Sequence, residues 1–108
     1  MRHLLITGVL QGPPVREVEV KKYLLDLVEI LNMKVLTPPV AKYCDDEFNE
    51  GVSGFIMITT SHISMHFWDN GLLQMDVFSC KNFHEYDVVE YMKKHLDLSI
   101  VYQKTIFR

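Results

Sequence analysis

Residues 55–78, with the sequence FIMITTSHISMHFWDNGLLQMDVF, contain three short runs that are rich in β-branched and aromatic side chains. The runs cover residues 55–60, 63–68 and 72–78, and each is typical of a β-strand. Asn70 and Gly71 separate the last two runs, and an Asn-Gly pair in this position is a good signal for a tight hairpin turn. The stretch therefore predicts neighbouring antiparallel strands.

Two amphipathic helices are predicted, one on each side of this stretch. Between residues 15 and 31 apolar residues recur every three or four positions and charged residues fill the other side, with Asn32 as a stop signal. Residues 85–96 show the same periodicity, with acids early and bases late, which suits the helix dipole. The remaining strands are expected at residues 3–10, 33–36 and 99–107, with a polar loop at residues 44–51.

The resulting order, β-α-β-β-β-β-α-β, predicts an α+β fold. An antiparallel sheet with two helices on one face forms a two-layer sandwich. If the other sheet face is apolar, a second copy should cover it and produce a four-layer αββα dimer. At 108 residues the chain is expected to be one domain that covers residues 1–108.

Composition excludes several classes of protein. Hydrophobic residues make up 48% of the chain and charged residues 23%, which is typical of a globular domain rather than a disordered one. Lys and Arg number 11 against 14 Asp and Glu, a balance that argues against a nucleic-acid partner. No apolar run approaches the roughly 20 residues of a membrane helix. Because Cys44 and Cys80 are too few for a disulfide framework, we expect a cytoplasmic protein without a membrane partner.

Residues 60–68, TSHISMHFW, are unusual for a strand. Alternation places His62, Ser64, His66 and Trp68 on one side, and two histidines beside a tryptophan indicate a site rather than a solvated surface. A metal is disfavoured because residues four apart in a strand lie about 13 Å from each other. Only a helix would bring both histidines onto one zinc ion, and the β-rich composition argues against a helix.

A set of short motifs across residues 51–80 points to one family. The motifs are Gly51-Val52-Ser53-Gly54, Ser61-His62-Ile63, His66-Phe67-Trp68, Asp76-Val77-Phe78 and Cys80. In their order and spacing they resemble the prokaryotic, pyruvoyl-dependent S-adenosylmethionine decarboxylases. Each motif alone is weak, but all of them together in order are a fairly specific signal.

The resemblance implies a proenzyme that cleaves itself between Thr60 and Ser61. In the family the serine hydroxyl attacks the preceding carbonyl, and β-elimination leaves a pyruvoyl group, here at residue 61, that forms a Schiff base with the substrate amine. Ser53 and His66 would assist this processing, and Cys80 would return a proton to the substrate carbon. No metal and no pyridoxal phosphate is implied. The family usually has Glu where this chain has Thr60, whose β-branch crowds the carbonyl.

The implied substrate is S-adenosylmethionine, decarboxylated to supply the aminopropyl donor for spermidine, a polyamine. After its Trp the family typically reads Pro-Glu, and that Glu binds the ribose hydroxyls. Here Asn70 occupies the Glu position with Asp69 beside it, so either residue is a candidate for the contact. Phe48 and Tyr43 are candidates for stacking on adenine, and Trp68 for the pocket wall.

These departures leave three hypotheses open. The first is the carboxy-lyase that acts on S-adenosylmethionine. The second is a pyruvoyl decarboxylase of another amine, such as ornithine or arginine, with Asp69, Asp76 or the acids of the loop at residues 44–47 facing a distal cation. The third is an unprocessed, non-catalytic relative that binds a partner enzyme or a small ligand. The resemblance also implies a homodimer with its sites at the subunit boundary, because so short a chain has little room for a cleft of its own.

Overall fold

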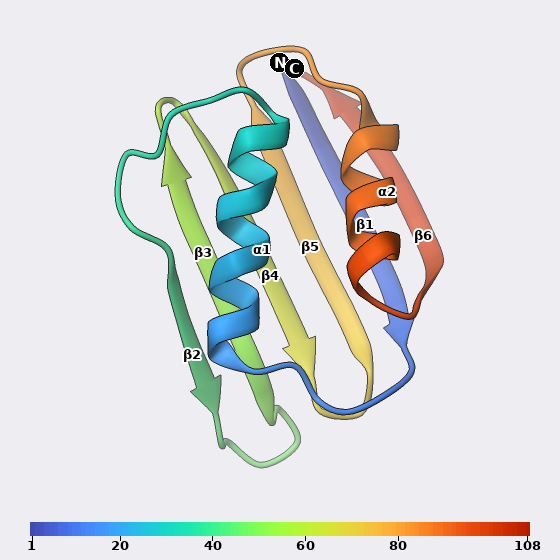
Figure 1. The fold of residues 1–108 in the computed structure, drawn as a ribbon. Helices are drawn as coiled ribbons and strands as arrows, with labels where there is room; N and C mark the ends of the chain where they lie inside the picture. The colour runs from blue at the N-terminus through green and yellow to red at the C-terminus, as the bar shows by residue number, and fades with distance from the viewer.

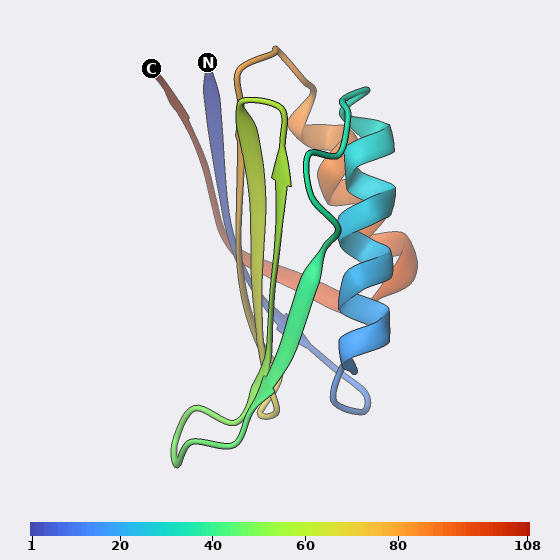
Figure 2. The same cartoon turned by 90° about the vertical axis from the view of Figure 1, so that its left-hand side faces the viewer.

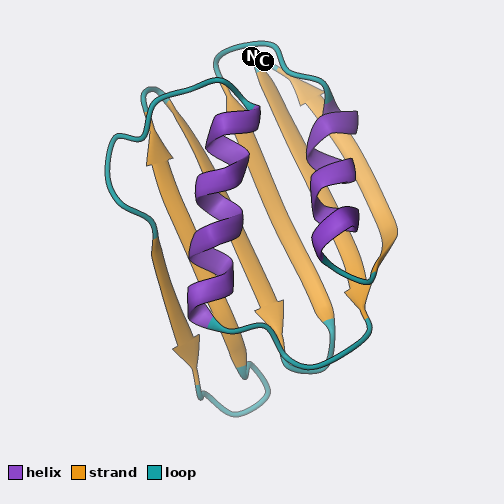
Figure 3. Ribbon diagram, viewed as in Figure 1, coloured by secondary structure: helices purple, strands orange, loops and turns teal.

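Six strands and two helices make up the chain in the computed structural model, which describes residues 1–108. Their order is β1 (Arg2–Leu10), α1 (Glu17–Ile30), β2 (Val40–Cys44), β3 (Gly51–Ile58), β4 (Ser61–Trp68), β5 (Leu72–Ser79), α2 (Glu85–His95) and β6 (Leu98–Phe107). All six strands pair antiparallel in one sheet with the order β2-β3-β4-β5-β1-β6. Figure 1 traces the chain, and Figure 3 separates helices from strands by colour.

Both helices cover the same face of the sheet, and the other face is open (Figure 2). α1 packs against β2 and β3, and α2 packs against β6. The core of 22 buried residues is shared among the helices, the sheet and the loops that join them. The chain is therefore an α+β sandwich with an antiparallel sheet, as predicted. Neither helix is long and apolar enough to cross a membrane.

The two helices form where the apolar periodicity predicted them. On α1 the buried residues Val20, Leu24 and Leu27 recur at intervals of three and four. α1 approaches β3 so closely that a Cβ on Gly54 would collide with Val20. Asn32 follows the last turn with a φ of 54°, the left-handed conformation that commonly ends a helix. These contacts hold α1 over one half of the sheet.

The strand predicted at residues 33–36 is wrong. Val35 makes only an isolated bridge with Ile58, and the next strand of the sheet is β2, which pairs with β3. β2 lies at the edge of the sheet, and Ala41 is its only fully buried residue. An edge strand buries few apolar side chains. The sequence of β2 therefore lacks the clear alternation of apolar and polar residues that predicts a strand. The polar loop is correspondingly shorter than predicted, since Cys44 ends β2 and Gly51 begins β3.

The hairpin predicted at Asn70-Gly71 is confirmed. β4 and β5 pair antiparallel on either side of it, and Gly71 has a φ of 100°. The Asn70 side-chain oxygen accepts a hydrogen bond from the backbone N–H of Leu72 at 3.0 Å. The side chain of Asn70 is therefore part of the turn itself.

Candidate active site

The candidate catalytic residues lie at the two opposite ends of β4. Ser61 is the first residue of the strand and His66 is five residues further on, which corresponds to about 17 Å of extended chain. The strand alternates as predicted, so Ser61 is buried on the helix side while His66 is exposed on the open face. We call Thr60, Ser61 and Cys80 the cleavage-end group. We call Ser53 of β3 and His66 of β4 the Ser53–His66 pair.

Sheet register brings the cleavage-end group together. His62 pairs with Phe78, so the beginning of β4 lies beside the end of β5. Cys80 directly follows β5, and its backbone N–H donates a hydrogen bond to Ser61 Oγ at 3.0 Å. Two residues that are nineteen positions apart are thus in direct contact. The serine predicted to supply the pyruvoyl group is held next to the cysteine predicted to donate a proton.

Thr60 occupies the tight turn between β3 and β4. Its φ is 61°, in the left-handed region that β-branched residues seldom adopt. Its Oγ1 lies 2.7 Å from Cys80 Sγ and 2.6 Å from the carbonyl oxygen of Thr59. The bond predicted to be cleaved therefore follows a residue with an unusual backbone conformation and a side chain in contact with the thiol.

These contacts change the acidity of the thiol. A hydrogen bond with the Thr60 hydroxyl, together with one from Ser61, lowers the pKa of Cys80 below the ordinary value of a cysteine. The positive charge of Lys81 acts in the same direction. A thiol with a lowered pKa gives up its proton more readily at neutral pH, which suits the role predicted for Cys80.

A hollow of about 450 Å³ opens beside the cleavage-end group. Its walls come from three segments that Figure 1 shows at the same end of the molecule: the end of α1, the β3–β4 turn and the residues after β5. The residues that line it are Asn32, Met33, Lys34, Thr59, Thr60, Cys80 and Lys81. Lys81 Nζ donates a hydrogen bond to the Asn32 carbonyl at 3.3 Å. The two lysines were not identified from the sequence, because neither lies in a motif.

The Ser53–His66 pair forms across two neighbouring strands. The register of β3 and β4 sets the two residues opposite each other, and Ser53 Oγ lies 2.8 Å from His66 Nδ1. Both side chains are on the exposed face. A smaller hollow of about 190 Å³ adjoins the pair, and Trp68 and Cys44 are among its walls. The structure thus brings Ser53 and His66 together but leaves them remote from Ser61 of the same chain.

Some of the candidate substrate-binding residues gather near the Ser53–His66 pair. Trp68 lies beside His66, with 6.0 Å between the ring centroids. The Tyr43 hydroxyl donates a hydrogen bond to Asp69 Oδ2 at 2.6 Å, and this bond raises the pKa of Tyr43 to about 12. Phe48, by contrast, is 85% exposed in the loop that joins β2 to β3. At this end the structure therefore assembles two aromatic side chains and one carboxylate.

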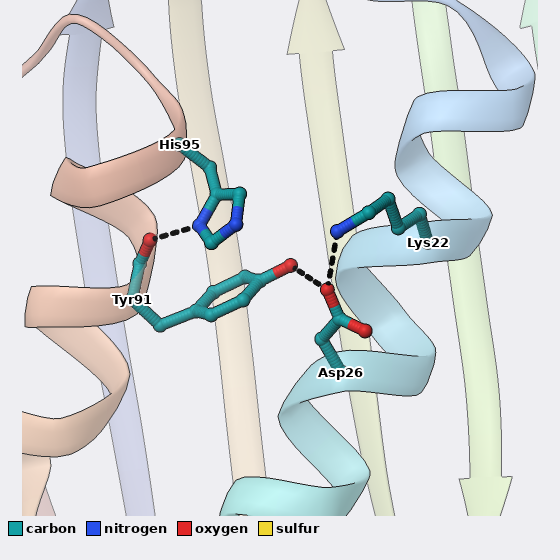
Figure 4. A network of polar contacts seen from close by, with 4 residues as sticks. All are labelled: Lys22, Asp26, Tyr91 and His95. Atoms are coloured by element: carbon teal, nitrogen blue, oxygen red, sulfur yellow. Dashed lines mark hydrogen bonds and ion pairs between the residues drawn. The ribbon is translucent and has the colours of Figure 1, made fainter.

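A third polar cluster joins the two helices (Figure 4). Asp26 of α1 accepts hydrogen bonds from Lys22 Nζ at 2.7 Å and from the Tyr91 hydroxyl of α2 at 2.5 Å. His95 Nδ1 lies 3.0 Å from the carbonyl oxygen of Tyr91. Burial and the bond to Asp26 both raise the pKa of Tyr91, so its hydroxyl stays a donor. We interpret this cluster as a structural link between the helices.

No three His, Cys, Asp or Glu side chains come together in a way that could hold a metal ion.

Comparisons of the chain with a family model and with individual proteins point to the same family. A model of the S-adenosylmethionine decarboxylase family matches residues 15–108. The chain is 32% identical over 94 residues to the S-adenosylmethionine decarboxylase proenzyme of Clostridium botulinum strain Langeland, covering 85% of this chain and 81% of that protein. It is also 37% identical over 54 residues to the proenzyme of the same name from Archaeoglobus fulgidus, covering 48% of this chain and 46% of that protein.

Proposed function

Because the chain belongs to the S-adenosylmethionine decarboxylase family, a family of carboxy-lyases, we propose that it is a proenzyme that cleaves itself between Thr60 and Ser61. The processed protein then decarboxylates S-adenosylmethionine in the cytoplasm and supplies the aminopropyl donor for spermidine. One observation carries this proposal: Cys80 contacts the Ser61 hydroxyl through its backbone N–H and the Thr60 hydroxyl through its sulfur. The residues that flank the cleavage bond and the proton donor therefore form one cluster.

The cleavage-end group fits a pyruvoyl group made from Ser61. The serine is buried, and the Cys80 N–H holds its hydroxyl oxygen in one position. When formed, a pyruvoyl group supplies the electron sink that the decarboxylation of an α-amino acid needs. Cys80 lies in the wall of the larger hollow, where its thiol can give a proton to a substrate carbon. In the uncleaved chain the Thr60 and Ser61 hydroxyls already hold the pKa of this thiol below its ordinary value.

The Ser53–His66 pair requires a second copy of the chain to reach the cleavage bond. Within one chain the pair is about 17 Å from the Thr60–Ser61 bond along β4. The open face carries exposed apolar side chains, among them Val40, Phe55 and Met57, which a partner sheet would cover. We therefore propose a homodimer in which two sheets pack face to face.

Symmetry gives this dimer a definite arrangement. A two-fold axis between the two sheets that crosses β4 at right angles near its middle lays the end of one β4 over the beginning of the other. The Ser53–His66 pair of one copy would then lie over the backbone of Thr60 and Ser61 of its partner, which it would approach from the open face. The pair would supply the base for elimination and a hydrogen bond to the intermediate of processing. Each dimer would contain two such sites.

The same arrangement would carry Tyr43, Trp68 and Asp69 toward the partner's cleavage end. Asp69 is a better candidate than Asn70 for a ribose contact. Tyr43 bonds only one carboxylate oxygen of Asp69, which leaves the other for the ribose, whereas the side-chain oxygen of Asn70 already accepts the Leu72 N–H within the turn. The aromatic rings of Tyr43 and Trp68 are available to pack against adenine. The nucleoside would thus bind at the subunit boundary.

Intact mass and CO2 release test this proposal. The purified chain should give two fragments, residues 1–60 and 61–108, and should release CO2 from S-adenosylmethionine. Ser61→Ala should leave one species and abolish CO2 release, while Ser64→Ala, a matched change on the same strand, should not. A single stable 12.7 kDa species for the unchanged chain would overturn the proposal. Release of CO2 from ornithine or arginine alone would replace the proposed substrate.

A further inference from the structure

We propose that the Thr60 hydroxyl is a positioning group for the Cys80 thiol and supports the sulfur both before and after it gives up its proton. This inference rests on the proposed function, in which Cys80 is the proton donor and cleavage breaks the bond after the Thr60 carbonyl. The Thr60 hydroxyl and the Thr59 carbonyl both stay in the fragment of residues 1–60 and are retained for turnover. The inference concerns Thr60, the residue on the N-terminal side of the proposed cleavage bond. The role therefore follows from the contacts of this chain.

The geometry offers the Thr60 hydroxyl two partners for one proton. Oγ1 lies 2.6 Å from the Thr59 carbonyl oxygen and 2.7 Å from Cys80 Sγ. A carbonyl oxygen only accepts hydrogen bonds, whereas a thiol donates and a thiolate accepts. Loss of the sulfur proton therefore leaves only one direction for the bond between Thr60 and Cys80, from the hydroxyl to the thiolate.

Two arrangements give the sulfur a hydrogen bond in each of its protonation states. When Cys80 is protonated, its S–H donates to Thr60 Oγ1, and the hydroxyl donates to the Thr59 carbonyl. When Cys80 has transferred its proton to a substrate carbon, the S–H bond electrons stay on sulfur as a thiolate. The Thr60 hydroxyl then rotates and donates to that thiolate. One side chain thus holds the sulfur in place in both states, by a rotation about a single bond.

In the uncleaved chain the β3–β4 turn places Thr60 against Cys80. The left-handed backbone of Thr60 at the β3–β4 turn presents the side chain to the segment that follows β5. Thr59, the preceding residue, lines the same hollow, but its side chain makes no hydrogen bond. The chain therefore contains a matched control, two adjacent threonines of which only one contacts the thiol.

The first experiment measures the thiol directly. In a full-length chain that carries Cys44→Ser and Ser61→Ala, Cys80 is the only thiol and no cleavage takes place. The rate of alkylation by iodoacetamide is then followed from pH 5 to 10. Adding Thr60→Val keeps the β-branch but removes the hydroxyl, so we expect the midpoint to rise and the rate at pH 7 to fall about threefold or more. Lys81 and Lys34, the charged groups that share the hollow, stay unchanged throughout.

Two controls separate the hydroxyl from the shape of the side chain. Thr60→Ser restores the hydroxyl and should return the alkylation profile to its starting position. Thr59→Val makes the same chemical change one residue away and should leave the profile unmoved. A profile that is identical for Thr60→Val and the parent chain overturns the inference. So does a profile that Thr59→Val shifts as much as Thr60→Val.

The second experiment separates this inference from the proposed function. Intact mass and single-turnover CO2 release are measured for Thr60→Val and Thr60→Ser in the otherwise unchanged chain. We expect Thr60→Val to cleave, because the backbone carbonyl remains, and to release CO2 with a pH profile displaced in the same direction as the thiol. A displaced alkylation profile without any cleavage of the unchanged chain would overturn the proposed function but support the contact. Normal cleavage with an unmoved alkylation profile would overturn the inference alone.

Discussion

The two ends of β4 hold different parts of one proposed site. The cleavage-end group is partly buried, and it is assembled from a turn, the first residue of β4 and the residue after β5. The Ser53–His66 pair is exposed and arises from the direct register of two neighbouring strands. A strand extends by more than 3 Å per residue. Ser61 and His66 are therefore far apart in space although they are only five residues apart in the sequence. A small sandwich can therefore carry half of a site at each end.

The largest expected effect is at the cleavage end. Ser61→Ala removes the nucleophile of the proposed self-cleavage, so no fragments should form at any incubation time. Intact mass measures this directly. His62→Ala is the matched control on the next residue, which faces the other side of the strand. Cleavage that persists in Ser61→Ala would show that residue 61 is not the cleavage residue.

The Ser53–His66 pair should act on the partner chain rather than on its own. We expect His66→Ala alone to slow cleavage by about 10²- to 10⁴-fold, the usual size of a lost general base. Co-expression with Ser61→Ala should restore cleavage, since the Ser61→Ala copy still supplies His66 to a partner that keeps Ser61. Mass spectrometry of the mixed sample distinguishes the two chains. Failure of the mixture to cleave, while a mixed dimer forms, would contradict the proposed arrangement.

The proton donor should affect turnover but not cleavage. Cys80→Ala keeps the backbone N–H that bonds Ser61, so fragments should still form, whereas CO2 release should fall by about 10²-fold or more. Donation requires the protonated thiol, so the rate of CO2 release should decline as pH rises through the pKa of Cys80. In the uncleaved chain the Thr60 and Ser61 hydroxyls hold that pKa below its ordinary value, and cleavage consumes the second of them. A rate that does not decline at high pH would contradict the assigned role.

A change at the other end should alter substrate binding by a smaller factor. Asp69→Asn removes the charge of the proposed ribose ligand, so KM for S-adenosylmethionine should rise by roughly tenfold. Steady-state CO2 release measures KM and kcat separately. Asp45→Asn, in the loop between β2 and β3, is the matched control and should leave KM unchanged. An equal effect of both changes would point to net charge rather than to a contact.

The smallest effect on cleavage and turnover is expected from the cluster that joins α1 and α2 through Asp26 and Tyr91, which we call the helix link. It lies away from both ends of β4. Tyr91→Phe removes the hydrogen bond to Asp26 and should lower the free energy of unfolding by about 1–2 kcal/mol, measured in urea. Cleavage should continue at its normal rate. Tyr86→Phe, at an exposed residue of the same helix, should change neither quantity.

The helix link should also depend on pH. Burial raises the pKa of Asp26, but the hydrogen bonds from Lys22 and Tyr91 outweigh it and hold the pKa below its ordinary value. A carboxyl group with a lowered folded pKa stabilises the fold above its unfolded pKa of about 3.9, and this stabilisation is lost as pH falls through the folded value. The difference between Tyr91→Phe and the unchanged chain should therefore shrink below about pH 4. An unchanged difference at low pH would contradict this account.

The features that could be predicted from the sequence are those set by local patterns. The periodicity of α1 and α2, the Asn70-Gly71 turn and the alternation along β4 each depend on residues that are close in the chain. β2 was missed because a strand at the sheet edge buries little more than Ala41. The family motifs identified Ser53, Ser61, His66 and Cys80, but no motif gave their distances.

By itself the sequence determined the class of fold and the family, and it supplied the residues proposed to carry the chemistry, because these depend on local periodicity and on motif spacing. Only the tertiary structure decided which of those residues meet. Register places Cys80 against Ser61 and Ser53 against His66, and the β3–β4 turn adds Thr60 to the first contact. The physical reason is that antiparallel pairing joins residues far apart in sequence, while an extended strand separates residues close together in it.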